Sequence, residues 1–432
     1  MVEVVSLISF VIMSVLFPSC YALVFGLAFF TVMLVMFQPV EPLIQYWFMS
    51  DMVSWLIMLI SIYVIMVASF PFWERPIHWV WVKILFMASI VFLYSTSMLS
   101  MFIAYEVSMI PIIYIVFFKS LSPERMKAGW YLFLYTALAS VPLMVVIIFL
   151  ATSGEKTFLY FLNSPQTQWV ELFMLLAFLV KTPLFFFHSW LLKAHVEASL
   201  EGSVLLAGVL LKFGSYGVYR LKMSGLFLPH SFLSRTIAAV ALFGSVLGAI
   251  GAFTEMDFKK IVAYSSVSHM NLSMGSLLFM KMISSKSFLL MTLSHAMSAV
   301  VLFFMATSIY SSVGGRSILL IKNFYRPDSW WLPATFMVWV INMSLPPSLG
   351  FMSEVMMLSS VSYSEPALAI LMVTSFMISS SYSSMAAISS ALLKGGSVLK
   401  KESESLYSFM VVFLCIAPCI LLFFLAFFML AA

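Results

Sequence analysis

The sequence predicts an all-α polytopic membrane protein of about fourteen transmembrane helices, on the basis of composition, run length and pattern. The 432 residues are 63% hydrophobic and 9% charged, whereas a soluble chain needs more charge to cover its surface. Continuously apolar runs of about 20 residues, the length that spans a bilayer, recur along the chain. Because these runs do not alternate in polarity, a membrane β-barrel is excluded. The loops between them are short and leave no room for a soluble domain.

The spans are expected in the following order. They lie at about 2–16, 18–37, 50–70, 80–98, 100–118, 129–151, 170–187, 203–220, 232–253, 260–280, 287–311, 330–353, 367–392 and 406–430. The first two spans are short and are separated only by Pro18.

Loop charge predicts the orientation of these spans. Most of the 22 Lys and Arg residues fall in loops after odd-numbered spans, among them Arg75, Lys119 and Lys259. The positive-inside rule therefore places that side in the matrix or cytoplasm and both termini opposite. The stretch from Met1 to Glu74 has no Lys or Arg, so we expect neither a secretory signal nor a transit peptide. An organelle-encoded or bacterial product fits this pattern.

Two spans are interrupted by proline. In the seventh span Pro183 follows Lys181, and in the twelfth Pro346 and Pro347 precede Glu354. Proline frees backbone carbonyl groups that lipid cannot satisfy, so such breaks belong where helices line a polar cavity. The two broken helices, 7 and 12, are five apart and cross the membrane in opposite directions, which is typical of inverted repeats. Two ordinary kinked helices remain the alternative.

This spacing predicts two inverted five-helix repeats. We expect N-terminal helices 1–3 in residues 1–79, the first repeat (helices 4–8) in 80–222, the second (helices 9–13) in 232–392, and helix 14 in 393–432.

The chain itself is predicted to hold no redox cofactor and no metal. Its three cysteines are too few for a disulfide framework, and Cys415 and Cys419 lie in the apolar final span, where cysteine usually behaves as a small hydrophobe. Neither a glycine-rich phosphate loop after a strand nor a Cys-x-x-Cys-His haem motif is present.

Four charged residues stand alone in apolar spans: Glu106, Lys181, Lys212 and Glu354. A charge at mid-membrane costs at least about 2.5–3.5 kcal/mol, so we expect these to be functional. The alternatives are a lysine that extends to the headgroups and, for Glu106, a purely structural partner for a lysine. Desolvation destabilises an ammonium group and a nearby carboxylate stabilises it again, so a glutamate that pairs with Lys181 and then releases it would push a proton onward.

Histidines extend this set. His269 and His295 fall in the tenth and eleventh spans, and imidazole binds and releases protons near neutral pH, which suits a relay between lysines. Hydrogen-bonded packing histidines are the alternative. His188 and His195 follow the seventh span; they either gate the relay or lie in a loop, and the loop is slightly favoured. Moving one proton against about 150–200 mV costs roughly 4 kcal/mol, which burial of charge is large enough to supply.

These residues lie in motifs that resemble a known family. VKTPLFFFHSWLLKAHVEASLEGSVLLAGVLLKFGSYGVYRL is similar to the helix 7–8 signature of the antiporter-like proton-pumping subunits of respiratory complex I (NADH:ubiquinone oxidoreductase). AYEVSMIP resembles the family's helix 5, EMDFKKIVAYSSVSHM its helix 9–10 turn, and MSLPPSLGFMSEVMML its broken helix 12. The resemblance extends with gaps from about residue 80 to 360.

The resemblance implies a role for each matching position. Glu106 and Lys181 match the family's modulating ion pair, Lys212 its central helix 8 lysine, His295 its helix 11 histidine, and Glu354 its terminal proton site. His269 and His188 are further candidates for the relay. The implied protein is a mitochondrial inner-membrane subunit that translocates protons while other subunits reduce quinone. NADH, FMN, iron–sulfur clusters and ubiquinone would belong to those partner subunits.

The expected partners are other membrane-arm subunits, especially neighbouring antiporter-like ones, and membrane lipids; no nucleic acid is expected. The sequence also departs from the family, which usually has proline at Leu192 and Ser199 and a small residue at Glu201. These departures leave the shape of the helix 7–8 connection open. A cation/proton antiporter subunit of the related family and a purely structural membrane scaffold remain as alternative functions.

Overall fold

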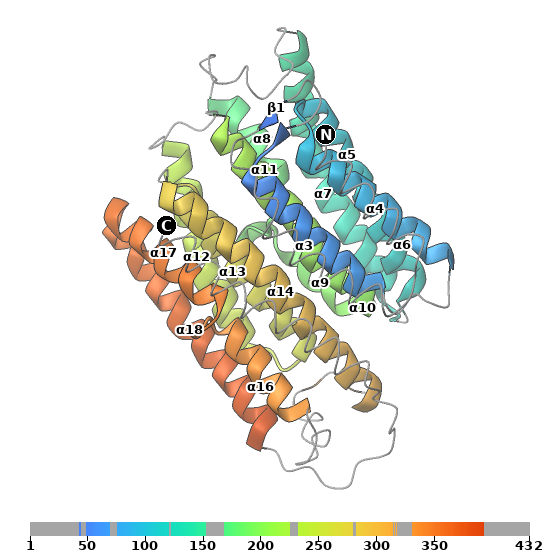
Figure 1. The fold of residues 1–432 in the computed structure, drawn as a ribbon, viewed down its shortest axis with the longest axis vertical. Coiled ribbons are helices and arrows are strands. Elements are labelled where there is room, and N and C mark those ends of the chain that lie inside the picture. Colours follow the sequence, from blue (N-terminus) through green and yellow to red (C-terminus); the bar gives the residue numbers. More distant parts are fainter. Residues whose placement is uncertain are drawn as a thin grey trace.

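The computed structural model shows a bundle of long helices packed side by side (Figure 1). It describes residues 43–44, 49–69, 76–120, 122–152, 168–224, 232–279, 282–313 and 331–392, together with positions 315 and 317. The predicted spans 2–16, 18–37 and 406–430, with Cys415 and Cys419, lie outside the described residues.

The first group of elements runs from a short β-ladder to the eighth predicted span. Strands β1 (Leu43–Ile44) and β2 (Met49–Ser50) pair antiparallel. They are followed by α3 (Met52–Ser69), α4 (Pro76–Tyr94), α5 (Met98–Val107), α6 (Met109–Lys119), α7 (Arg125–Thr152), α8 (Gln168–Lys181), the 3₁₀-helix η3 (Phe185–Phe187), α9 (Ser189–Glu197), α10 (Leu200–Leu205), the π-helix η4 (Leu206–Leu210) and α11 (Leu211–Met223).

The second group consists of α12 (Phe232–Thr254), α13 (Phe258–Leu277), α14 (Met282–Val313), α16 (Trp331–Asn342), α17 (Leu349–Ser364) and α18 (Pro366–Leu392). Predicted spans in the described residues match single helices or pairs of short helices. The twelfth is the exception, because α17 continues to Ser364 beyond the predicted end at 353.

Five continuous helical stretches among the described residues are long and apolar enough to cross a membrane. They are Met98–Lys119, Arg125–Thr152, Leu200–Met223, Phe232–Thr254 and Ile283–Ser308. The two proline-containing spans are divided into shorter helices, as predicted.

The two groups lie next to each other, with α14 between them (Figure 1). α14 contacts α13 and α17 of its own group and α3, α10 and η4 of the other. Helix α14 therefore connects the two halves of the bundle at its centre.

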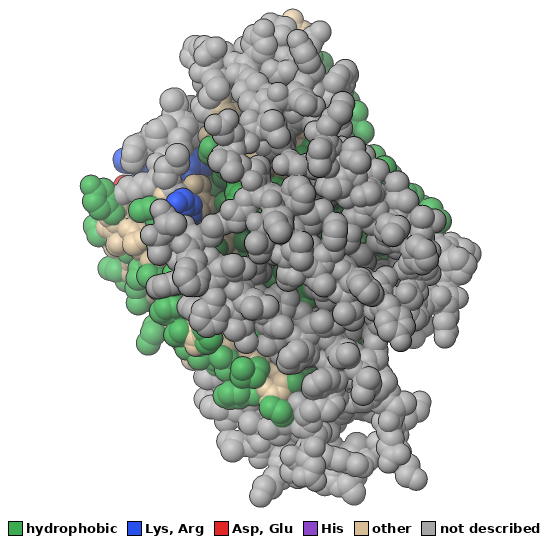
Figure 2. Space-filling view, viewed as in Figure 1, with side chains coloured by type: hydrophobic (Ala, Val, Ile, Leu, Met, Phe, Trp, Pro, Cys, Tyr) green, Lys and Arg blue, Asp and Glu red, His purple; other side chains and the backbone are tan. Residues whose placement is uncertain are grey.

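Burial differs sharply between the helices. In Leu200–Met223 the most apolar 18 residues are 100% buried, whereas only 39% of the corresponding residues of α7 are buried. Leu138 of α7, for example, is 71% exposed. The described side chains visible at the surface in Figure 2 are mostly hydrophobic, as expected where lipid is the solvent. Lys181, Lys212, His269 and His295 are each 5% exposed or less, so they lie inside the bundle.

Candidate functional site

The seventh span is broken immediately after Lys181. Helix α8 ends there, and Thr182, Pro183 and Leu184 precede η3. Trp190 Nε1 donates to Val180 O at 3.1 Å, and Asn271 Nδ2 of α13 donates to Pro183 O at 2.9 Å. Neighbouring side chains therefore satisfy the carbonyl groups that the break frees, which lipid could not do.

The Lys181 ammonium lies against Tyr105 of α5. The lysine is 1% exposed; its Nζ donates to Tyr105 O at 3.0 Å and lies 3.1 Å from the centroid of the Tyr105 ring. Tyr105 OH in turn donates to Ala177 O at 2.7 Å, which fixes the ring. A carbonyl dipole and an aromatic face together stabilise the buried charge.

Glu106 is the next residue, yet its carboxylate does not contact Lys181. No ion pair within 4.0 Å joins the two residues, and Glu106 Oε1 is buried without a hydrogen-bond partner. Glu106 and Lys181 therefore lie where α5 meets α8, but their charged groups are more than 4.0 Å apart. We call this the separated arrangement. Their ion pair remains a prediction.

Lys212 follows the π-helix η4 on a fully buried helix. Its side chain is 1% exposed, and Nζ donates to Ala207 O, inside η4, at 3.0 Å. π-helical turns leave irregular carbonyl groups and are frequent at functional sites. Sequence reasoning missed this turn. Gly208 within it allows the close approach of α3, since an added Cβ would overlap Val64.

From Lys212 a series of buried ionisable groups extends across the second half. Lys212 Nζ lies 3.0 Å from His295 Nδ1 of α14. The His295 and His269 rings have centroids 6.3 Å apart at an interplanar angle of 55°. His269 Nδ1 of α13 lies 3.9 Å from Glu354 Oε1 of α17. Two of the four predicted charged residues and two predicted histidines thus lie in one spatial series, which we call the relay series: Lys212, His295, His269 and Glu354.

The break in the twelfth span places Glu354. Helix α16 ends at Asn342 and α17 begins at Leu349, and Ser344 between them has φ 56°, a left-handed conformation uncommon for a residue other than glycine. Ser344 Oγ donates to Glu354 Oε1 at 2.7 Å. The irregular segment thereby supplies a hydrogen bond to a carboxylate whose side chain is only 13% exposed.

His188 lies apart from the relay series. Its ring stacks on Phe185 with centroids 4.5 Å apart and lies near Tyr264, and its Nδ1 contacts Phe185 O. It is half-buried in the turn before α9.

His195 is inside α9, so the preference for a loop at this position was wrong. The helix restarts at Ser189 after the 3₁₀ turn. The His195 ring is 0% exposed and stacks on Phe303 at 4.4 Å, and neither ring nitrogen has a hydrogen-bond partner.

The region between Lys181 and Lys212 is apolar. Phe213 has its ring centroid 6.0 Å from Lys181 Nζ, and α8 and α11 pack so closely that a Cβ on Gly214 would lie 2.8 Å from Thr182 N. No described hydrogen bond joins the two lysines. The site therefore has two parts, the Glu106–Lys181 crossing and the relay series. Within the described parts of the chain, no group of three or more His, Cys, Asp or Glu could hold a metal ion.

The helix 7–8 connection, whose shape the sequence left open, is a two-residue break at Ala198 and Ser199 between α9 and α10. Glu201, the carboxylate that departs from the family pattern, is 5% exposed and forms an ion pair with Lys119 of α6. Its long-range partner, 82 residues away, could not be identified from sequence.

Solved structures show where this fold occurs. A chain in "Respiratory complex I from Thermus thermophilus with bound NADH" matches with a TM-score of 0.77 at 20% identity, over 93% of this chain and 88% of that one. A chain of the Mrp complex from Dietzia has a TM-score of 0.77 at 16% identity, over 89% of this chain and 76% of that one. At these identities the similarity shows the fold.

Sequence comparisons show the family. NADH-ubiquinone oxidoreductase chain 4 of Myxine glutinosa is 35% identical over 278 residues, 62% of this chain and 59% of that protein. The protein of the same name from Locusta migratoria is 32% identical over 388 residues, 84% of each chain. The family model of the NADH:quinone oxidoreductase/Mrp antiporter transmembrane region matches residues 95–379. The resemblance predicted from the motifs is confirmed: the chain belongs to the NADH:quinone oxidoreductase/Mrp antiporter family, in the group of NADH-ubiquinone oxidoreductase chain 4.

Proposed function

We propose that this chain is a proton-translocating membrane-arm subunit of respiratory complex I in the mitochondrial inner membrane. Four ionisable side chains from four helices form one buried series, and this observation supports the proposal most strongly. The chain would act as part of the proton-translocating NADH:ubiquinone reductase. NADH, FMN, iron–sulfur clusters and ubiquinone would be held by its partner subunits, among which neighbouring antiporter-like subunits and lipids would contact it.

Proton transfer would begin at Lys212. A proton can pass from Lys212 Nζ to His295 Nδ1, because these atoms are 3.0 Å apart. The next step, between rings whose centroids are 6.3 Å apart, requires a bridging water or ring rotation. Glu354 would receive the proton from His269 and hold it at the far end of the series, with Ser344 orienting the carboxylate.

Glu106 would control the proton held by Lys181. In the separated arrangement the ammonium contacts the carbonyl group and the ring of Tyr105. Approach of the Glu106 carboxylate would stabilise the charged lysine, and its withdrawal would favour proton release toward the relay series. His188 contacts Phe185 and Tyr264, and we do not include it in the relay.

The proposal predicts that Lys212→Met abolishes most proton pumping by the assembled complex. Methionine keeps a long apolar side chain but cannot hold a proton. A matched control is Lys222→Met on the same helix, because Lys222 is also buried and its Nζ donates to Leu277 O and Ser284 Oγ, outside the relay series. Both variants would be reconstituted in liposomes and protons counted per NADH oxidised. Unchanged pumping with Lys212→Met would reject the relay.

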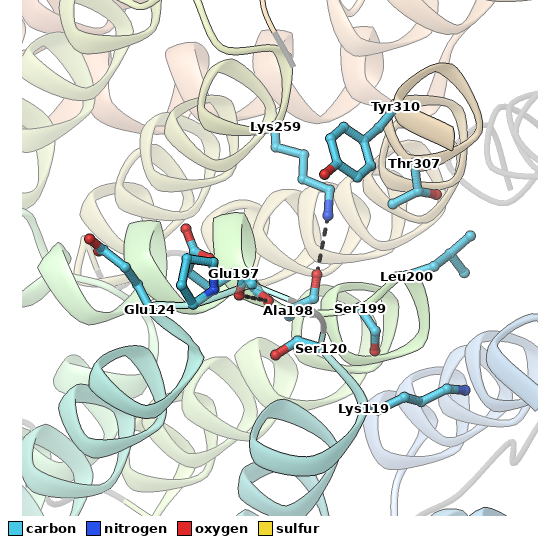
Figure 3. Close-up of a pocket in the computed structure, with 12 residues that line it drawn as sticks. Lys119, Ser120, Glu124, Glu197, Ala198, Ser199, Leu200, Lys259, Thr307 and Tyr310 are labelled. Atoms are coloured by element: carbon cyan, nitrogen blue, oxygen red, sulfur yellow. Dashed lines mark hydrogen bonds between the residues drawn. The ribbon is translucent and has the colours of Figure 1, made fainter. Parts of the chain in front are cut away.

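We further propose fourteen spans, with inverted repeats in 80–222 and 232–392, three helices in 1–79 and a last helix in 393–432. The helix breaks at Pro183 and at Pro346 and Pro347, in oppositely directed spans, support this division. Both termini would lie on the intermembrane-space side. Lys119 and Lys259 line one pocket (Figure 3), on the side proposed to face the matrix; labelling the two ends of α7 tests this orientation.

A cation/proton antiporter subunit is the second candidate, because the Dietzia Mrp chain shares the fold. It predicts cation-driven proton movement in liposomes without NADH. Proton movement that requires NADH and quinone would favour the complex I assignment.

A further inference from the structure

The α9–α10 connection is held by side chains from other helices. Ser122 Oγ donates to Glu197 O at 3.2 Å, and Lys259 Nζ of α13 donates to Ala198 O at 3.1 Å. Lys119 of α6 forms its ion pair with Glu201 in the first turn of α10. A pocket of about 580 Å³ opens over this connection (Figure 3). Three contacts, two from the end of α6 and the loop after it and one from α13, therefore hold the chain at the break and on both sides of it.

Two local backbone hydrogen bonds hold the connection, from Ala198 N to Ala194 O and from Ser203 N to Ser199 O, but the Ser199 side chain adds none. Ser199 has φ −62° and ψ 171°, and Ala198 has φ −67° and ψ 151°. These are the angles that a proline ring would impose on itself and on the residue before it, but serine is free to leave them. Ser199 also caps no helix, since its hydroxyl has no hydrogen-bond partner. The contacts from the other segments add to the restraint that these backbone bonds give.

The segment after the connection positions Lys212. α10, η4 and α11 form one uninterrupted helical stretch from Leu200 to Met223, so a shift or rotation at Glu201 reaches Ala207 and Lys212. The bond from Lys212 Nζ to Ala207 O lies within this stretch and would move with it, whereas the 3.0 Å contact with His295 Nδ1 reaches another helix, α14. A displacement of 1 Å would break a hydrogen bond of this length.

Burial distinguishes the Lys119–Glu201 pair from other ion pairs at this end. Its side chains are 15% and 7% exposed, whereas those of Lys260 and Glu255 are 39% and 29% exposed. Water can replace either partner of an exposed pair at little cost, but it reaches a buried carboxylate poorly. Loss of the Glu201 charge should therefore destabilise the first turn of α10, where Glu201 lies.

We propose that Glu201 is a positioning residue of the relay: its ion pair with Lys119 fixes the start of α10 and thereby keeps Lys212 Nζ within reach of His295. This inference rests on the proposed function. In this proposal the Lys119–Glu201 ion pair provides the conformational restraint that a proline at position 199 would provide.

The test compares three variants in the assembled complex. Glu201→Gln removes the charge, Glu201→Gln with Ser199→Pro adds the local restraint back, and Glu255→Gln is the exposed control. Amide hydrogen exchange of residues 200–212 and protons pumped per NADH are measured for each. We expect Glu201→Gln to speed exchange about tenfold and to lower the proton ratio, the added proline to restore both, and the control to change neither.

Each other result overturns the inference. Unchanged exchange in Glu201→Gln would show that the pair does not restrain α10. Faster exchange with an unchanged proton ratio would show that the restraint does not serve the relay. If Glu201→Gln fails to assemble, the charge swap Lys119→Glu with Glu201→Lys decides: restored assembly and pumping support the inference, and failure contradicts it. Pumping by Lys212→Met, measured separately, tests the proposed function itself.

Discussion

A lone lysine in an apolar helix needs acceptors from the surrounding chain, and Lys181 and Lys212 obtain them in different ways. Lys181 uses a carbonyl and a ring of the same residue, Tyr105. Lys212 uses a carbonyl of the π-helix and the imidazole of His295. Only the second arrangement includes a group that can accept the proton, so at the scale of single residues Lys212 is the better starting point for transfer.

Glu354 is predicted to matter through its ability to hold a proton. Glu354→Gln keeps the oxygen that accepts from Ser344 Oγ, so we expect a change in stability below about 1 kcal/mol but a clear fall in protons pumped per NADH. The measurement is proton pumping by the reconstituted complex, with thermal unfolding as the check on stability.

The matched control for Glu354 is Glu365→Gln. Glu365 caps the same helix, its side chain is 37% exposed, and its partner Arg235 is 3.8 Å away. Equal losses of pumping in the two variants would mean that position 354 has no special part in transfer.

Sequence reasoning identified the members of the relay series because a buried charge is costly and therefore conspicuous. It placed them in separate spans, and the structure brings them together. It could not identify Tyr105 as the partner of Lys181, because a tyrosine in an apolar span is unremarkable. It also could not pair Lys119 with Glu201, whose contact depends on the packing of α6 against α10.

At the scale of secondary-structure elements, Lys181, Lys212 and Glu354 lie near irregular positions in their helices. Proline marked the helix break at Pro183 and the one before Glu354. The π-helix Leu206–Leu210 has no such marker, because LAGVL reads as ordinary apolar helix. The twelfth span was predicted to end at about 353, whereas α17 starts after the prolines and continues to Ser364. The location of a span is thus easier to predict from sequence than the hydrogen-bond pattern within it.

Helix α7 offers a direct test of orientation. Its 28 residues would extend about 42 Å, enough to cross the roughly 30 Å hydrocarbon core. Glu124, just before it, and Thr152, its last residue, are both exposed. With Thr152→Cys, we expect an impermeant thiol reagent to react from the intermembrane-space side. Glu124→Cys should react only from the matrix side. The reverse pattern would contradict the orientation, and the parent chain gives the background from the three native cysteines.

For the whole molecule, the position of α14 is the main consequence of the fold. This helix lies between the two groups of helices and contacts both, and it presents His295 to Lys212 of the first group and toward His269 of the second. The proposed proton route would therefore run between the halves of the bundle. Span order could be predicted from sequence, but the central placement of α14 could not, since it depends on packing between distant segments.

The most direct test of this account interrupts the relay series in its middle and leaves both charged ends in place. Protons pumped per NADH oxidised would be counted for reconstituted complex that contains His295→Phe, beside His188→Phe as the histidine outside the series. The account predicts a clear fall in the ratio for His295→Phe and an unchanged ratio for His188→Phe. An assembled His295→Phe enzyme that pumps the full number of protons would contradict it.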